Sequence, residues 1–250
     1  MKILECVPNF SEGQNRQTID AIADALQRVS GVRLLDICTD ADHNRTVFTF
    51  VGSPDGIEKA AAAACDRALA LIDMRAQRGV HPRIGAVDVV PFIPLKNAVM
   101  ADAVETARRF GRAFAQRNGL PVYFYGEAAL VEEHRELPHI RRGGYEGLEK
   151  RMKDPDWAPD AGPSVLNERS GATAVGARDF LVAYNVNLAS AELGCLTEML
   201  VIVAVPPQLR VTVKSPVVRL PSRSPTLTGL WLLMPFALVY TRSLKITLAE

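Results

Sequence analysis

The chain has 250 residues, of which 48% are hydrophobic and 23% are charged, a balance typical of a soluble globular protein. The formal net charge is +1, so the overall charge gives no argument for a nucleic-acid partner. Four scattered cysteines form no Cys-x-x-Cys pair, which excludes a zinc-ribbon or thioredoxin-type motif. Sparse cysteines, together with Glu5 and Pro8 where a signal peptide needs an apolar run, predict a cytoplasmic protein.

The segment up to residue 92 predicts six elements in the order β-α-β-β-α-β. Apolar residues recur at steps of three and four from Ile19 to Val29 and make one helix face. Ser53 and Pro54 are an N-cap and a first-turn proline for a second, alanine-rich helix. This order is the ferredoxin-like one, which forms an antiparallel sheet with both helices on one face. Strands are predicted over 2–7, 32–38, 46–51 and 86–92, and helices over 16–29 and 57–72.

Further predicted elements extend this core to residue 188. The predicted fold class is therefore α+β, with a ferredoxin-like βαββαβ core extended by a further helix and strands, in a mixed sheet with helices packed on one face. The added elements are a helix over 103–116, a strand over 121–125, broken surface helix over 127–152, loop over 157–171, a turn and strand edge over 171–178, and a last strand over 180–188.

The periodic pattern ends after residue 188, so we expect one domain over 1–188 and an atypical tail over 189–250. Residues 199–250 contain six basic residues and one acidic residue, and prolines recur through them. The uncharged run 224–241 approaches the ~20 residues of a membrane span. Two prolines, a glycine and three threonines interrupt that run, so a membrane span is not expected.

His81 and Arg83 lie on a predicted tight loop at the start of a core strand. Gly79, Pro82 and Gly85 punctuate this loop, and Pro82 biases His81 toward extended backbone. An unperturbed histidine has a pKa of about 6.5, so it can take and return a proton near neutrality. His81 is therefore a candidate catalytic acid-base residue. The alternative is a surface histidine, or one that is only hydrogen-bonded within the loop.

Loops from the other strands are expected to crowd the same end of the sheet. Arginines there can grip carboxylates, so an acid-base histidine beside them suits group transfer to or from an anionic amino acid. The other interpretation is surface ion pairing for the arginines and helix capping for Ser11 and Glu12. No metal site is predicted, because His134 and His139 are poorly spaced for shared ligation. The candidate substrate-binding residues are Asn9, Ser11, Arg45, Arg83, Gly162, Pro163, Ser164, Gly171 and Thr173.

Six segments carry a resemblance to a known family. They are Cys6–Gly13, His43–Gly52, His81–Pro94, Tyr123–Ala129, Trp157–Ser164 and Gly171–Arg178. In this order they resemble the formiminotransferase domain of glutamate formimidoyltransferases, specifically its N-terminal subdomain. The resemblance runs from about residue 1 to about residue 188, and six motifs in one order are more specific than any single motif.

The resemblance implies a transferase that moves a formimino group from N-formimidoyl-L-glutamate to N5 of tetrahydrofolate, in histidine degradation. It implies that His81 is the catalytic acid-base residue and that the loop from Gly162 to Gly171 lines the folate site. It also implies tetrahydrofolate as co-substrate and a homodimer of two-subdomain protomers.

The tail departs from the family pattern. Only 62 residues follow Leu188, and they do not resemble the second subdomain that the family has there. A shifted reading frame, a truncated second subdomain or a genuinely divergent tail would each explain this composition. The alternative function is a non-catalytic or inactive ferredoxin-like module that binds folate or another small anion. A nucleic-acid reader is disfavoured, because the first 188 residues are net acidic.

Overall fold

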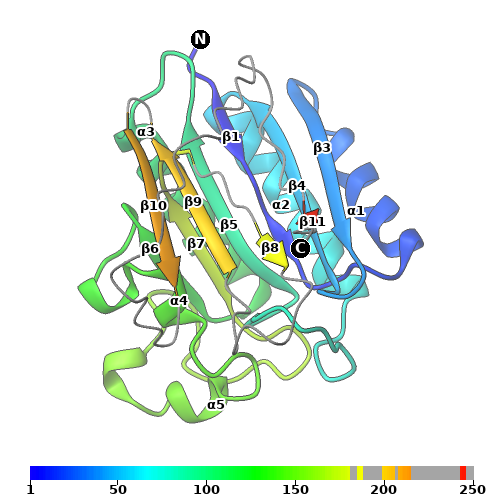
Figure 1. Ribbon diagram of the computed structural model, residues 1–250, viewed down its shortest axis with the longest axis vertical. Helices are drawn as coiled ribbons and strands as arrows, with labels where there is room; N and C mark the ends of the chain where they lie inside the picture. The colour runs from blue at the N-terminus through cyan, green and yellow to red at the C-terminus, as the bar shows by residue number, and fades with distance from the viewer. Residues whose placement is uncertain (181–184, 188–198, 206–207, 215–242, 246–250) are drawn as a thin grey trace, which may run out of the picture. The chain divides into compact units, whose positions relative to one another are not determined.

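A computed structural model describes residues 1–180 with their side chains, and the strands at 185–187, 199–205, 208–214 and 243–245 (Figure 1). The chain contains two compact units, Met1–Asp179 and Phe180–Glu250. The strands of the first unit are β1 (Leu4–Cys6), β2 (Asn9–Phe10), β3 (Val32–Asp40), β4 (Arg45–Gly52), β5 (Val87–Pro94), β6 (Val122–Gly126) and β7 (Thr173–Ala177). Its helices are α1 (Arg16–Gln27), α2 (Pro54–Leu71), α3 (Met100–Asn118), α4 (Leu137–Ile140) and α5 (Leu148–Arg151), with 3-10 turns η1 (Glu132–His134) and η2 (Pro155–Trp157).

Strands β1 and β2 act as one interrupted strand in the middle of the sheet, because both pair with β4 on one side and β5 on the other. Pro8 lies in the interruption, where it has no N–H to offer the ladder, and its carbonyl accepts a hydrogen bond from Phe48 N at 3.0 Å. The order across the sheet is β3, β4, β1/β2, β5, β7, β6. Pairing is antiparallel from β3 to β5 and parallel from β5 to β6. The predicted ferredoxin-like order and its extension into a mixed sheet are confirmed.

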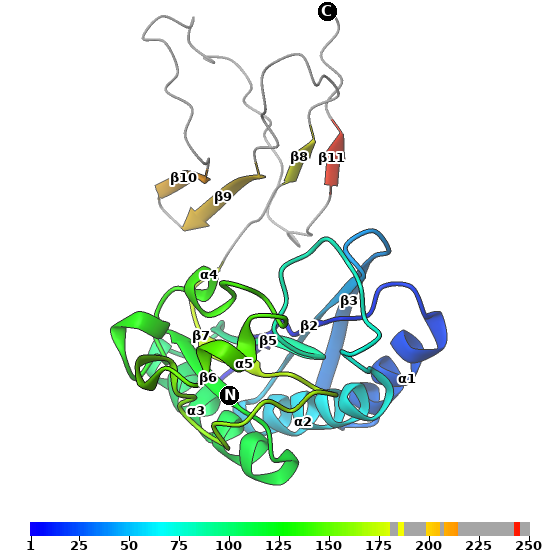
Figure 2. The same ribbon diagram turned by 90° about the horizontal axis from the view of Figure 1, so that it is seen from below.

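The three long helices α1, α2 and α3 lie on one side of the sheet, as predicted (Figure 2). The Asn15 side chain accepts from Thr18 N at the start of α1, and Ser53 accepts from Gly56 N at the start of α2. The larger core lies between these helices and the sheet, and its big side chains are aromatic. Phe10 packs edge to face on Phe48 with ring centroids 5.3 Å apart.

The opposite face of β5, β7 and β6 carries a second, smaller core. The segment predicted as broken helix contains η1, α4 and α5, and its buried residues Ile140 and Leu148 pack in one cluster with Tyr123 and Tyr125 of β6. Short helices therefore cover this side of the sheet, in addition to the three long helices on the other side. The reason is that β6 and β7 are apolar on both faces, so each face needs a cover.

The described residues of the second unit form two strand pairs. β9 (Met199–Val205) pairs with β10 (Gln208–Lys214) in antiparallel register, and β8 (Asn185–Asn187) pairs with β11 (Ser243–Lys245) in parallel. Of the strand predicted over 180–188, the described part contains only β8, and the run 224–241 lies outside the described residues. In the part of the chain that the structure describes, no helix is long and apolar enough to cross a membrane.

Candidate functional site

One edge of the sheet gathers the loops that carry most of the candidate residues. The register puts the start of β4, the end of β2 and the starts of β5 and β7 at this edge. Gly85 forms an isolated bridge with Gly171, and Ser11 N donates to Ala86 O at 3.0 Å. We call residues 11–14, 40–45, 79–86 and 170–172 the His81 edge.

The His81 ring lies inside this edge, with 9% of the residue exposed. Its Nε2 lies 2.9 Å from Arg45 Nη1. Because a guanidinium only donates, Nε2 accepts this hydrogen bond and the neutral ring carries its proton on Nδ1. Burial, and then the charges of Arg45, Arg141 and His43, lower the pKa of His81 to about 2, against a smaller opposing effect of Asp40. In this arrangement the imidazole is neutral at physiological pH.

His43 and Asp40 form the outer side of the same cluster. The two histidine rings meet edge to face with centroids 5.9 Å apart. His43 Nδ1 lies 2.8 Å from Asp40 Oδ2, and His43 N donates to Asp40 Oδ1 at 2.8 Å. Burial works against the charged form of Asp40, but the hydrogen bonds from His43 outweigh it and lower the pKa of this carboxyl. Asp40 therefore places one negative charge near the two histidines.

Arg45 and Arg83 have different environments. Burial, followed by the charge of Arg141, lowers the pKa of Arg45, and its Nε is buried with no hydrogen-bond partner among residues 1–180. Arg83 donates to Gln77 Oε1 at 2.7 Å and to both carboxylate oxygens of Glu146 at 2.9 and 2.7 Å. Arg83 is therefore already paired with a carboxylate, whereas the Nε of Arg45 has no acceptor among residues 1–180.

Asp88 and Arg141 are site residues that the sequence reasoning did not include. Asp88 is 1% exposed, and its Oδ1 accepts from Ile84 N at 2.9 Å, which ties the His81 loop to β5. Its Oδ2 accepts from Arg141, which follows α4. Asp88 is the one charge in an apolar strand, a signal that could have found it. Arg141 has no such signal, because it lies in a segment rich in charges.

Asn44 joins three loops of the His81 edge. Its backbone has a positive φ of 47°, a conformation that asparagine tolerates better than most residues. Its Oδ1 accepts from Gly13 N at 2.8 Å, and its Nδ2 donates to Arg78 O at 2.7 Å. A Cβ on Gly13 would lie 2.2 Å from Asp40 O, so only glycine fits this contact. The loops are therefore held in place by the Asn44 side chain and by the close backbone approach at Gly13.

The remaining candidates divide into two groups. Ser11 Oγ donates to Gly85 O at 2.7 Å, and Asn9 Nδ2 donates to Val7 O at 3.1 Å, so both side chains also support local backbone. Thr173 is 1% exposed, and its hydroxyl has no hydrogen-bond partner within the described part of the chain. Gly171 lies at the His81 edge beside Gly85.

The second group is the exposed run Gly162, Pro163 and Ser164. This run lies next to the start of β6. Ala161 bridges Val122, and a Cβ on Gly162 would lie 2.0 Å from Leu120 O. Four strand spacings separate β6 from β4, which is about 19 Å. The fold thus brings His81, Arg45, Ser11 and Gly171 together, and the 162–164 run lies beside β6, four strand spacings across the sheet from β4.

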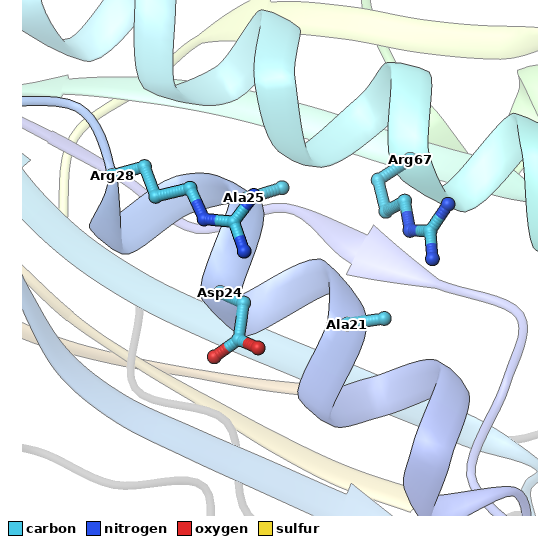
Figure 3. A pocket seen from close by; sticks show the side chains of 5 residues that line it. All are labelled: Ala21, Asp24, Ala25, Arg28 and Arg67. Carbon is cyan, nitrogen blue, oxygen red and sulfur yellow. The ribbon is translucent and has the colours of Figure 1, made fainter.

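A shallow groove of about 320 Å³ lies between α1 and α2 (Figure 3). It is lined by Ala21, Asp24, Ala25, Arg28 and Arg67, and by no residue of the His81 edge. Among the described side chains, no group of three or more His, Cys, Asp and Glu residues could hold a metal ion.

The fold and the His81 edge together define a class of protein. The chain is an α+β protein with a ferredoxin-like sheet order, and at one sheet edge a neutral histidine lies beside arginines suited to anionic ligands.

Comparison with known proteins names the family within that class. Residues 3–178 match the family model described as formiminotransferase domain, N-terminal subdomain. The chain therefore belongs to the formiminotransferase family, and the resemblance of the six segments is confirmed.

Curated relatives match over the same part of the chain. Over 187 residues the chain is 49% identical to formimidoyltransferase-cyclodeaminase of Gallus gallus, covering 75% of this chain and 35% of that protein. It is 46% identical over 190 residues to glutamate formimidoyltransferase of Thermoplasma acidophilum, covering 75% of this chain and 62% of that protein. For glutamate formimidoyltransferase of Streptococcus pyogenes serotype M1 the identity is 43% over 187 residues, with the same coverage. The chain spans about a third to three-fifths of these relatives.

Proposed function

We propose that this chain takes part in transfer of a formimino group from N-formimidoyl-L-glutamate to N5 of tetrahydrofolate, in histidine degradation. Family membership over residues 3–178 and the names of the relatives support the reaction class. The observation that carries the proposal within the structure is the neutral His81 ring held against Arg45 at a sheet edge where the loops converge. Tetrahydrofolate acts here as co-substrate.

The proposed chemistry needs one residue that moves a proton. The N5 amine attacks the formimino carbon, a C–N bond forms, and the tetrahedral species carries an ammonium at N5. His81 accepts that proton and gives it to the glutamate nitrogen, whose bond to the same carbon then breaks. A neutral imidazole can do both transfers in turn, as general base and then general acid.

The substrate contacts follow from where the candidates lie. Arg45 binds a carboxylate, and Arg83 holds the 77–85 loop against Glu146 unless a substrate displaces that residue. Asn9, Ser11, Gly171 and Thr173 shape the middle of the sheet edge, and Gly162, Pro163 and Ser164 contact the more distant part of the folate. We further propose that residues 1–188 are the first subdomain, 189–250 an atypical tail, and that the protein is a cytoplasmic homodimer. Light scattering on the full chain tests the oligomeric state.

Turnover by a His81 variant tests the mechanism. The full chain is mixed with N-formimidoylglutamate and tetrahydrofolate, and formation of the formimino product is followed by absorbance. We expect His81→Asn to reduce turnover by about a hundredfold or more, the usual contribution of an acid-base residue. The control is His139→Asn, an exposed histidine in α4 that should keep wild-type turnover.

Two results would change the assignment, and a third would call for a second variant. Wild-type turnover in His81→Asn removes His81 from the mechanism. Absence of turnover in the unaltered chain, with tetrahydrofolate still bound, supports the alternative of a non-catalytic folate-binding module. Loss of the circular-dichroism spectrum in the variant would show unfolding, and the comparison would then be repeated with His81→Gln.

A further inference from the structure

The ring nitrogen that a base must use is occupied in this structure. Nε2 of His81 accepts from Arg45 at 2.9 Å, and Nδ1 carries the ring proton. A guanidinium does not give up a proton, so this bond cannot serve as a relay. The imidazole therefore cannot accept a proton from a substrate until Arg45 moves away from Nε2.

Two guanidinium groups near His81 each have one buried donor with no acceptor in the described part of the chain. The Nε of Arg45 and the Nε of Arg141 are both buried, and neither has a hydrogen-bond partner among residues 1–180. Burial, and after it the charge of Arg141, lowers the pKa of Arg45. Buried donors without acceptors beside a concentrated positive charge are suited to a carboxylate, which has about four acceptor positions.

The two arginines differ in how firmly they are held. Arg141 is anchored by the buried carboxylate of Asp88, while Arg45 is held to His81 by one hydrogen bond to a neutral nitrogen. A bond to a carboxylate is roughly twice as strong as a neutral one. An arriving carboxylate would therefore attract Arg45 more strongly than His81 does, with Arg141 as the fixed side of the site.

We propose that a substrate carboxylate binds between Arg45 and Arg141 and draws Arg45 away from Nε2, so that His81 can accept a proton only when the anionic substrate is present. Arg141 is then a substrate-binding residue, and Arg45 also controls access to the base. The proposal rests on the proposed function, in which His81 moves the proton.

The charged groups that face His81 determine in which direction its pKa is expected to change when a carboxylate binds. They are Arg45, Arg141 and His43, which lower its pKa, and Asp40, which raises it. Asp88 is paired with Arg141. A bound carboxylate adds negative charge and moves one cation away from the ring, and both changes raise the pKa of His81.

Nitrogen NMR of histidine-labelled full chain tests this directly. The four histidine signals are assigned with His81→Asn, and pH titrations are recorded with glutarate, with the neutral glutaramide and with neither. At a pH above about 5, where glutarate is ionised, we expect millimolar glutarate to shift the Nε2 signal of His81 as the hydrogen bond from Arg45 is lost, and glutaramide to leave that signal unchanged. Arg141→Gln should weaken the glutarate effect about tenfold or more, whereas the neighbouring exposed Arg142→Gln should not.

Each outcome bears on the proposal. An unchanged Nε2 signal of His81 with ionised glutarate, whether or not glutarate binds elsewhere, contradicts it, and so does an equal glutarate effect in Arg141→Gln. The measurement needs no turnover, so it separates this inference from the transferase assignment. If the His81 signal responds to glutarate but the chain shows no turnover, the carboxylate site is supported and the transfer reaction is contradicted.

Discussion

At the level of single atoms, the acceptor nitrogen of the His81 ring faces a cation. Arg45 contacts Nε2, and Arg141 adds further positive charge. Such surroundings disfavour the imidazolium ion in the folded state. They do not act on the unfolded chain, where the histidine has its ordinary pKa.

This difference predicts an acid-sensitive stability. In the unfolded chain His81 has a pKa of 6.5, so it binds a proton once the pH falls below that value. In the folded chain its pKa is about 2, so it stays neutral until the pH is far lower. Stability is therefore unaffected by His81 above pH 6.5 and falls as the pH drops through the window from about 6.5 toward 2, by up to about 1.4 kcal/mol per pH unit. Urea unfolding of wild type and His81→Asn at several pH values measures the effect.

The comparison needs a matched histidine. His139→Asn, on the exposed side of α4, should leave the acid dependence of the free energy of unfolding like that of wild type. If wild type and His81→Asn lose stability in parallel between pH 6.5 and 5, His81 does not have the surroundings described here.

At the scale of elements, the His81 edge depends on two strands that approach through glycines. The Gly85–Gly171 bridge brings the start of β5 against the turn before β7. Gly171 has a φ of 71°, and a Cβ there would lie 2.1 Å from Ile84 O. The contact is backbone against backbone, so no side-chain rotation can relieve it.

Gly171→Ala should therefore destabilise the protein more than a positive φ alone would. The control is Gly119→Ala at the end of α3, where φ is 60° and nothing lies within 4 Å of an added Cβ. We expect the control to lose about 1–2 kcal/mol of unfolding free energy. Gly171→Ala should lose about 1–3 kcal/mol more, because the added Cβ overpacks the backbone contact. Thermal unfolding measures both, and equal losses would show that the backbone contact is not tight.

At the scale of the first unit, the layer of short segments is fixed to the sheet by a buried polar pair. His134 and Asp160 have side chains 2% and 6% exposed, with Nδ1 and Oδ2 2.9 Å apart. The same Oδ2 accepts from Phe124 N in β6 at 2.7 Å. One carboxylate thus joins η1, the loop before β7 and the sheet.

Asp160→Ala should lower the free energy of unfolding by about 3–5 kcal/mol. The reason is that the Phe124 N–H and the buried His134 ring both lose their shared partner. The control is Asp156→Ala, at an exposed residue of η2. Its free energy of unfolding should be within about 0.5 kcal/mol of the wild-type value. Denaturant unfolding of both variants gives the two free energies. A loss near that of the control in Asp160→Ala would mean that this pair does not hold the layer.

Much of the fold and part of the site follow from local sequence. The periodicity of the helices, the caps at Asn15 and Ser53, and the βαββαβ order require only neighbouring residues, and the structure confirms that order. The punctuated loop at His81 is equally local. Which loops share one sheet edge follows from strand direction once the fold order is known.

The partners of each charge were decided by tertiary structure. Arg83 meets Glu146 across 63 positions, Asp88 meets Arg141 across 53, and Arg45 meets His81 across 36. No sequence pattern encodes such pairs, because they arise only when the sheet brings distant loops together and burial excludes water from between them. The sequence alone identified the fold order and an acid-base candidate, and the folded chain determined that its nitrogen faces a guanidinium.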